Sequence, residues 1–280
     1  MLMEYSWLAP AVLCGLIALV GNIVLGEQVL KRQIIFIDLA VAQVAALGAA
    51  LSQYWLSRFA LFSGSWFAEM IGPWVMSLLL CGLIALMEKR YKQHLEPMIG
   101  SLFVVSASLA ILLVSKDPHG ADFIQGILNG QLLWSTWDDV WPLAIITAAM
   151  LVLINVKPEF MQGSGFYLIF AILMPITVKL TGIYLEFALL VIPALCAAAL
   201  KGLRFFIASI GIGTVGILSG LAASARYDLP SGASIVITLF LVGVMFSIVM
   251  QLRRYLRDTK SAKSYCCLLY TSPSPRDTRE

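Results

Sequence analysis

The chain has 280 residues, of which 60% are hydrophobic and only 12% are charged, and its mean hydropathy is +0.89. A soluble domain carries about twice that fraction of charged residues, so a soluble globular protein is excluded. The net charge of +3 is distributed over short loops and forms no single basic patch, so no nucleic-acid partner is expected. The apolar residues instead form blocks of roughly 17–25 residues, the length that a helix needs to cross a lipid bilayer.

The sequence predicts nine apolar helices. In chain order they cover residues 7–27, 34–56, 66–88, 99–115, 139–156, 166–182, 183–200, 205–225 and 233–252. The sixth and seventh have barely a turn between them, at Gly182, so we expect about eight or nine spans. The alternation of apolar and polar residues that marks a membrane β-strand is missing from these blocks. The predicted fold class is therefore an all-α, polytopic transmembrane helical bundle in contact with the lipid bilayer.

Lysine and arginine are distributed unequally between the two sets of loops. One set carries thirteen and the other four, and the more basic set is expected in the cytoplasm. Nine spans then place the amino terminus outside and the carboxyl terminus inside. We predict a transmembrane permease domain at 1–257 and a cytoplasmic tail at 258–280. From about residue 264 the tail is polar, rich in Pro and Ser, and similar to a translated cloning sequence, although a natural disordered tail has the same composition.

Glycines in the eighth block match a nucleotide-binding pattern, but they lie in a context that favours another role. Gly211 and Gly216 fit G-x-G-x-x-G, which needs a preceding strand and a helix that opens after the turn. Because these residues lie within an apolar helix, we interpret Gly211, Gly216 and Gly220 as sites of close helix packing. The sequence contains no P-loop and no H-E-x-x-H motif. We therefore predict no enzyme activity and no catalytic residues.

Polar side chains inside the predicted spans are the candidates for a transport path. A charge near the centre of a bilayer is costly and usually faces a polar pathway or a partner. Asp38 lies one turn into the second block, with Gln43 five residues later, and Glu186 lies near the start of the seventh. Five residues turn a helix by about 500°, so Asp38 and Gln43 need not share a face. Location near the membrane surface, in contact with water, is the alternative for both carboxylates.

A proline divides the seventh block in the stretch LLVIPALCAA. Pro193 removes a backbone donor and bends a helix, and Lys201 and Arg204 follow it. This arrangement predicts that the chain turns along the cytoplasmic surface after Pro193. A simple packing kink explains the proline equally well.

Four stretches, taken in order, resemble the zinc/manganese/iron permease family of bacterial ATP-binding-cassette importers. They are GEQVLKRQIIFIDLAVAQVAALGAAL, FIQGILNGQLLWSTWDDV, LTGIYLEFALLVIPALCAAALKGLR and ARYDLPSGASIVI. The resemblance covers residues from about 12 to 252. It implies a multi-pass permease of the cytoplasmic (inner) membrane that acts as a homodimer with a central path, together with a cytoplasmic ATP-binding subunit and an extracytoplasmic metal-binding protein.

The resemblance also implies roles for single residues. The segment from Ala194 to Arg204, which follows Pro193 and includes Lys201, would contact the ATPase. Asp38 would bind the transported zinc, manganese or iron transiently, and the chain itself would hold no cofactor, because ATP binds to the partner subunit. Family members commonly carry a histidine four residues after the aspartate. Here that position is Ala42. If the glycine is the anchor of the alignment, Gln43 takes the place of the histidine and Asp38 is shifted by one residue. A glutamine offers a carbonyl oxygen but no strong soft ligand, which puts zinc specificity in doubt.

Two other transport functions fit the composition. Permeases for cobalamin or iron chelates are related, but they are usually longer and carry a basic residue soon after the corresponding proline. A stand-alone ion-coupled transporter usually has inverted repeats and several charges within the membrane, and this sequence has no clear internal repeat.

Overall fold

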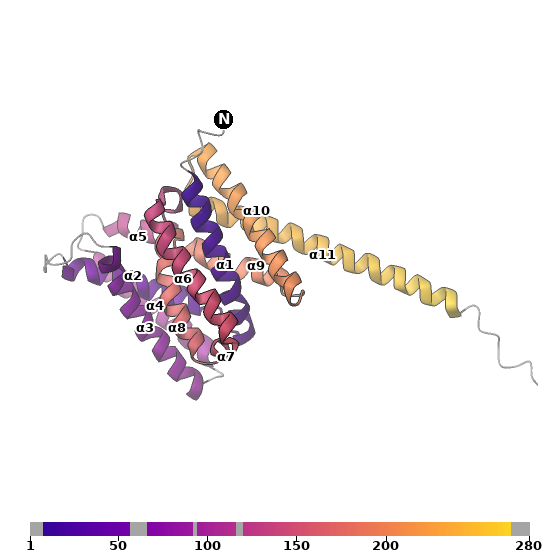
Figure 1. The fold of residues 1–280 in the computed structure, drawn as a ribbon, viewed down its shortest axis with the longest axis horizontal. Coiled ribbons are helices and arrows are strands. Elements are labelled where there is room, and N and C mark those ends of the chain that lie inside the picture. The colour runs from indigo at the N-terminus through magenta and orange to yellow at the C-terminus, as the bar shows by residue number, and fades with distance from the viewer. Residues whose placement is uncertain (1–7, 57–65, 92–93, 116–119, 270–280) are drawn as a thin grey trace, which may run out of the picture.

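The computed structural model describes residues 8–56, 66–91, 94–115 and 120–269. Within these ranges the chain forms helices and no strand, which confirms the all-α prediction. In chain order the elements are α1 (Ala9–Arg32), α2 (Ile37–Leu56), α3 (Trp66–Arg90), α4 (Leu95–Val114), α5 (Gly120–Asn129), the 3-10 turn η3 (Leu132–Trp134), α6 (Trp137–Val156), α7 (Pro158–Gln162), α8 (Gly165–Thr181), α9 (Ile183–Ala197), α10 (Leu203–Tyr227) and α11 (Ser231–Leu269). Figure 1 shows one bundle, from which the later part of α11 extends.

The helices confirm the multi-span prediction. Six are long and apolar enough to cross a membrane, namely α1, α4, α6, α10 and most of α3 and α11. The bent pair α8–α9 makes a seventh if the two helices cross as one span, and α2 is a shorter apolar helix. Each predicted block thus corresponds to one helix, and the expected count of about eight or nine spans is close to the observed set.

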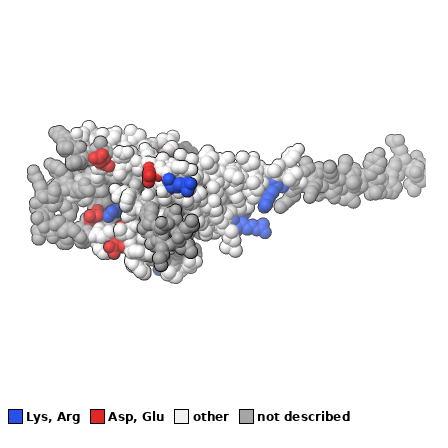
Figure 2. Space-filling view, turned by 90° about the horizontal axis from the view of Figure 1, so that it is seen from above, with Lys and Arg blue, Asp and Glu red and all other residues white. Residues whose placement is uncertain are grey.

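The outer surface of the bundle is apolar. In Figure 2 most of the described surface is uncharged, with only isolated acidic and basic side chains. Large apolar side chains point outward, for example Leu86 and Leu112 at 68% exposure and Leu79 at 64%. Because lipid tails are the solvent that such a surface suits, the chain is a multi-pass membrane protein.

The last helix passes through the predicted start of the tail without a break. α11 continues to Leu269, so no helix end marks the expected boundary at residue 258. Residues 270–280 lie outside the described part of the chain, and the foreign or disordered nature of the tail from residue 264 stays a prediction.

The bend between α8 and α9 lies at Gly182 and measures 116°. α8 runs antiparallel to α1. At its start, the carbonyl of Gly163 accepts a hydrogen bond from the guanidinium of Arg32, at the end of α1. Further along, the side chain of Leu173 lies against Gly21. The end of α8 is therefore far from the basic end of α1.

α9 runs back in the direction of α1. Near its start, Glu186 lies close to Asn22, and one turn later the carbonyl of Leu190 lies directly against Gly26. Because α9 runs parallel to α1, the end of α9 lies on the same side of the bundle as the end of α1. Lys201 follows there, on the side that the charge distribution predicts to be cytoplasmic.

The helices form two groups, which we name by their members. The first group is α1, α6, α9, α10 and α11, and the second is α2, α3, α4 and α8. The most extensive contacts lie within the groups, and the contacts of α8 with α1, α6 and α9 and of α2 with α9 join the two groups. In Figure 1, α2, α3 and α4 lie to the left and α9, α10 and α11 to the right.

Glycines permit close contacts inside the first group. Gly216 faces Leu239 of α11, and Gly220 faces Ile235, so that an added Cβ at either would overlap that helix. The space beside Gly211 is open. Gly211 therefore lacks the packing contact expected of it, and Gly213, which touches Leu19 of α1, has that contact instead.

Candidate metal-ion path

Three polar side chains from three helices meet inside the bundle. Asn22 of α1 and Glu186 of α9 are fully enclosed, and Asp38 of α2 is 1% exposed. Asp38 interacts electrostatically with Glu186, and the Asn22 amide lies near the Glu186 carboxyl. We call these three residues the oxygen cluster, and Asp38 with Glu186 the carboxyl pair. The cluster lies between the two helix groups, because Asp38 belongs to the second group and its partners to the first.

The break at Gly182 places Glu186 in this cluster. Gly182 has φ +79° and Gly130 has φ +67°, a left-handed conformation that favours glycine. The two glycines lie backbone to backbone, so a Cβ on either would overlap the other segment. Beside them the amide of Gln131 donates to the carbonyl of Leu180 at 3.1 Å. The connection after α5 thus supports the break from outside.

Local hydrogen bonds fix the Glu186 side chain. α9 begins directly after Gly182, whose carbonyl accepts the amide of Glu186 at 3.0 Å. The hydroxyl of Thr181 donates to Glu186 Oε2 at 2.8 Å. That leaves Oε1 of Glu186 enclosed and without a hydrogen-bond partner.

The two carboxyl groups stand at helix starts. Asp38 lies in the first turn of α2, and Glu186 in the first turn of α9. The positive end of a helix dipole stabilises a carboxylate, but two carboxylates in a low-dielectric interior repel each other strongly. The carboxyl pair therefore favours a species of positive charge between its members, either a proton or a cation.

Each residue of the oxygen cluster has an oxygen without a partner. Oδ1 of Asn22, Oδ1 of Asp38 and Oε1 of Glu186 are all enclosed, and the Asn22 amide nitrogen is likewise unpaired. Buried polar atoms are nearly always hydrogen-bonded, so a group of unpaired ones indicates a ligand. Carboxylate and amide oxygens suit hard divalent cations. The described residues contain no group of three or more His, Cys, Asp or Glu side chains that could bind a metal, so the cluster has two carboxylates and one amide.

Gln43, predicted to line the path together with Asp38, is not joined to the cluster. Its side chain is half-buried, and it shares no hydrogen bond with either carboxyl group of the pair. The residue one turn after Asp38 is Ala42, which packs on Val178 and Ile183 beside the break. Asn22 is the member of the oxygen cluster that we did not predict from the sequence. The sequence feature that could have indicated it is a lone amide in the apolar run GLIALVGNIVLG.

The residues predicted to contact an ATPase lie at the far end of α9. Pro193 is buried, and its carbonyl accepts a hydrogen bond from the hydroxyl of Ser209 at 3.3 Å. Lys201 and Arg204 are exposed at the start of α10, next to Leu203. Pro193 thus belongs to the helix contact between α9 and α10, whereas the two basic residues lie on the surface.

The chain is similar over most of its length to transport proteins. The sequence profile described as the ABC 3 transport family matches residues 4–162 and 154–250. A manganese transport system membrane protein of Halalkalibacterium halodurans is 26% identical over 273 residues, covering 88% of this chain and 89% of the relative. A probable metal transport system membrane protein of Chlamydia pneumoniae is 23% identical over 249 residues, covering 81% and 84%.

A solved structure has the same fold. The structure of PsaBC from Streptococcus pneumoniae in complex with Fab superposes with a TM-score of 0.70 at 20% sequence identity. The match covers 88% of this chain and 92% of the other. At this level of identity the likeness concerns the fold.

The geometry of the break predicts a large effect of Gly182→Ala. The new Cβ requires a strained backbone at φ +79° and overlaps Gly130, so we expect destabilisation by about 1–3 kcal/mol or more from strain and overpacking. Thermal unfolding of the purified chain in detergent measures this. Gly100→Ala is the control, because nothing lies within 4 Å of its added Cβ. Equal unfolding temperatures for the two variants would contradict the role given to the break.

Proposed function

The chain belongs to the ABC 3 transport family, and from this premise we propose that it is the membrane-spanning permease subunit of an ATP-driven importer of a divalent metal ion. The ion passes through the oxygen cluster. The chain lies in the bacterial cytoplasmic (inner) membrane and has no hydrolytic activity of its own. ATP binds to and is hydrolysed by a separate cytoplasmic subunit, and an extracytoplasmic metal-binding protein delivers the ion.

The observation that carries this proposal is the enclosure of the carboxyl pair. Both side chains are buried in a membrane bundle, where a lone carboxylate costs several kcal/mol. Packing alone does not account for two buried carboxyl groups that interact electrostatically and each have an unpaired oxygen. A divalent cation removes the repulsion and satisfies the unpaired oxygens of Asn22, Asp38 and Glu186 together.

The oxygen cluster also favours one kind of cargo. Its donors are two carboxylates and an amide, whereas zinc in proteins is held mainly by thiolate and imidazole. Ala42, at the position where the family commonly has histidine, supplies no donor. We therefore propose Mn²⁺ as the preferred ion. The printed name of the Halalkalibacterium halodurans relative, a manganese transport protein, supports the same choice.

The proposed partners fit the surface at the ends of the bundle. The exposed basic residues Lys201 and Arg204 lie between two exposed leucines, Leu195 at 59% and Leu203 at 75%. An apolar surface with a positive charge suits a protein partner with an acidic rim, and we propose the ATP-binding subunit there. A second copy of the chain completes the permease, and each copy carries its own complete oxygen cluster.

Removing either carboxylate tests the path. We expect Asp38→Asn and Glu186→Gln to lower Mn²⁺ uptake by about 10-fold or more, since even outer-sphere changes at metal sites cost 10–100-fold. Uptake is measured in cells that express the chain with its ATPase and binding protein. Glu159→Gln is the matched control, because this carboxylate is exposed on α7.

The same assay separates the proposal from its rivals. Uptake that survives both substitutions contradicts the path. Uptake that persists without the ATPase indicates a stand-alone transporter, and uptake of a chelate or cobalamin in place of Mn²⁺ indicates the related importer class.

Charge reversal tests the proposed ATPase contact. The double substitution Lys201→Glu and Arg204→Glu places two acidic groups opposite an acidic rim, and we expect about 10-fold weaker association with the ATPase. Co-purification of the complex from membranes measures it. Arg226→Glu is the control, because Arg226 is exposed at the opposite end of α10. Unchanged association in the double variant would remove this segment from the interface.

A further inference from the structure

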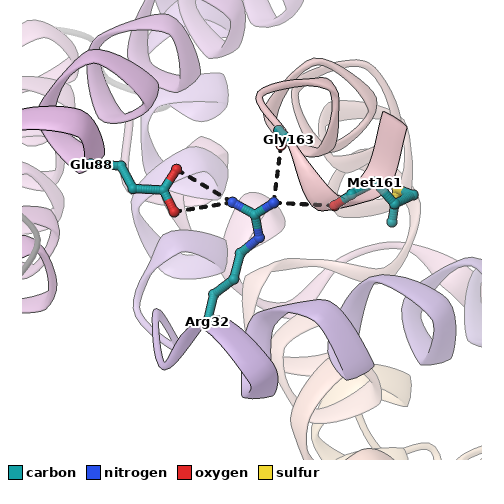
Figure 3. Close-up of polar contacts among 4 residues, drawn as sticks. All are labelled: Arg32, Glu88, Met161 and Gly163. Carbon is teal, nitrogen blue, oxygen red and sulfur yellow. Dashed lines mark hydrogen bonds and ion pairs between the residues drawn. The ribbon is translucent and has the colours of Figure 1, made fainter. Parts of the chain in front are cut away.

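The side chain of Arg32 joins three parts of the bundle at the basic end of α1 (Figure 3). Its Nη1 donates to Glu88 Oε1 at 3.1 Å and Oε2 at 3.3 Å, near the end of α3. Its Nη2 donates to the carbonyl oxygens of Met161 in α7 at 3.1 Å and of Gly163, in the turn between α7 and α8, at 3.0 Å. We call this set of contacts the Arg32 clamp.

Aromatic rings complete the surroundings of the guanidinium. Its carbon lies 4.9 Å from the ring centre of Phe166 and 5.4 Å from that of Tyr167, within the range of a cation–π interaction. The Arg32 side chain is 14% exposed and that of Glu88 is 28% exposed. The clamp is thus well packed, yet water reaches its outer edge.

Beneath the clamp lies a closed apolar layer. Val29, Phe166 and Phe170 are fully enclosed, and Ile34 is 2% exposed. Arg32 follows Asn22 by ten residues on α1, a rise of about 15 Å. Val29 on α1 and Phe166 and Phe170 on α8 lie between the level of Arg32 and that of Asn22, because α8 runs antiparallel to α1.

In the second group, α8 is joined to α3 near its end and in its middle. Near the end of α8, Lys179 forms an ion pair with Glu69 of α3 at 2.8 Å. In the middle, the indole of Trp74 on α3 donates to the carbonyl of Ile172 at 3.1 Å. Because α3 and α8 are joined along their length, they can move as one unit relative to α1.

Arg32 connects this unit to the first group. It belongs to α1, and its acceptors belong to α3, to α7 and to the turn between α7 and α8. The oxygen cluster lies between the same two groups, and its Asn22 is about 15 Å from Arg32 along α1. Separating the groups at the basic end of α1 would expose the apolar layer to that side of the membrane. Such a separation requires that the guanidinium release its acceptors.

We propose that the Arg32 clamp is the closure of the ion path on the basic, cytoplasmic side. While it is formed, the ends of α1, α3 and α8 enclose the apolar layer; its release lets the two groups part and exposes the layer to the cytoplasm. The contacts suit reversible opening, because both side chains are partly exposed and water can take the place of the protein acceptors once they part. Gly163 has open space around it, so the turn can move. This inference rests on the proposed function, since it takes the oxygen cluster as the path.

Cysteine labelling tests the clamp without any metal. The reporter is Val29→Cys in the full chain with its native cysteines changed to alanine, in everted vesicles that expose the cytoplasmic face to a maleimide. We expect Arg32→Ala to raise the labelling rate about 10-fold or more, because even one hydrogen bond to a charged group is worth at least as much as a tenfold change in an opening equilibrium. Glu88→Gln, which keeps the carbonyl contacts, should give a smaller rise.

Two controls make the result specific. Lys31→Ala removes the neighbouring basic residue, which pairs only along α1 with Glu27, and should leave labelling of Val29→Cys unchanged. Leu19→Cys, buried on α1 beyond the oxygen cluster, should stay unreactive in Arg32→Ala. No rise at Val29→Cys overturns the proposal, and so does an equal rise at both reporters, which indicates general loosening. Because the readout needs no ion, its failure is distinct from a failure of Mn²⁺ uptake.

Discussion

The electrostatic repulsion between two enclosed carboxyl groups is the constraint on which the site depends. Asp38 and Glu186 come from different helix groups, are both buried, and interact electrostatically. The two helix starts that carry them stabilise negative charge, and the unpaired oxygens beside them accept a cation. The break at Gly182 makes this possible, because it ends one helix and begins another in the middle of the bundle. A continuous helix across that position would not present a helix start to Asp38.

Much of the architecture could be predicted from hydropathy alone. Each apolar block became a helix, since length and composition decide what crosses a bilayer. The short gap at Gly182 was visible in the sequence, and it became the bend that turns α9 back along α1. The tertiary contacts could not be predicted in the same way. Gly211 and Gly213 have the same sequence context, yet only Gly213 contacts another helix, because the rotation of α10 is set by its neighbours.

Single residues of the candidate site could be predicted from the sequence, but their positions relative to one another could not. Asp38 and Glu186 stood out as charges in apolar runs, whereas their proximity depends on how α2 and α9 cross. Gln43 was a reasonable choice on the same helix, but its angular distance from Asp38 keeps it from the pair. Asn22 was missed because an amide in a span is cheaper than a charge and so gives a weaker signal. Its two unpaired atoms identify it only in three dimensions.

The central claim is that the oxygen cluster binds a hard divalent cation, and direct titration of the purified chain with Mn²⁺ tests it most simply. The electron paramagnetic resonance signal of free Mn²⁺ falls as the ion binds to protein, so the method counts bound ions without transport or partner subunits. The account predicts binding of one Mn²⁺ per chain that is lost in the double variant Asp38→Asn and Glu186→Gln. Binding that is unchanged in the double variant, or absent from the unsubstituted chain, would contradict it.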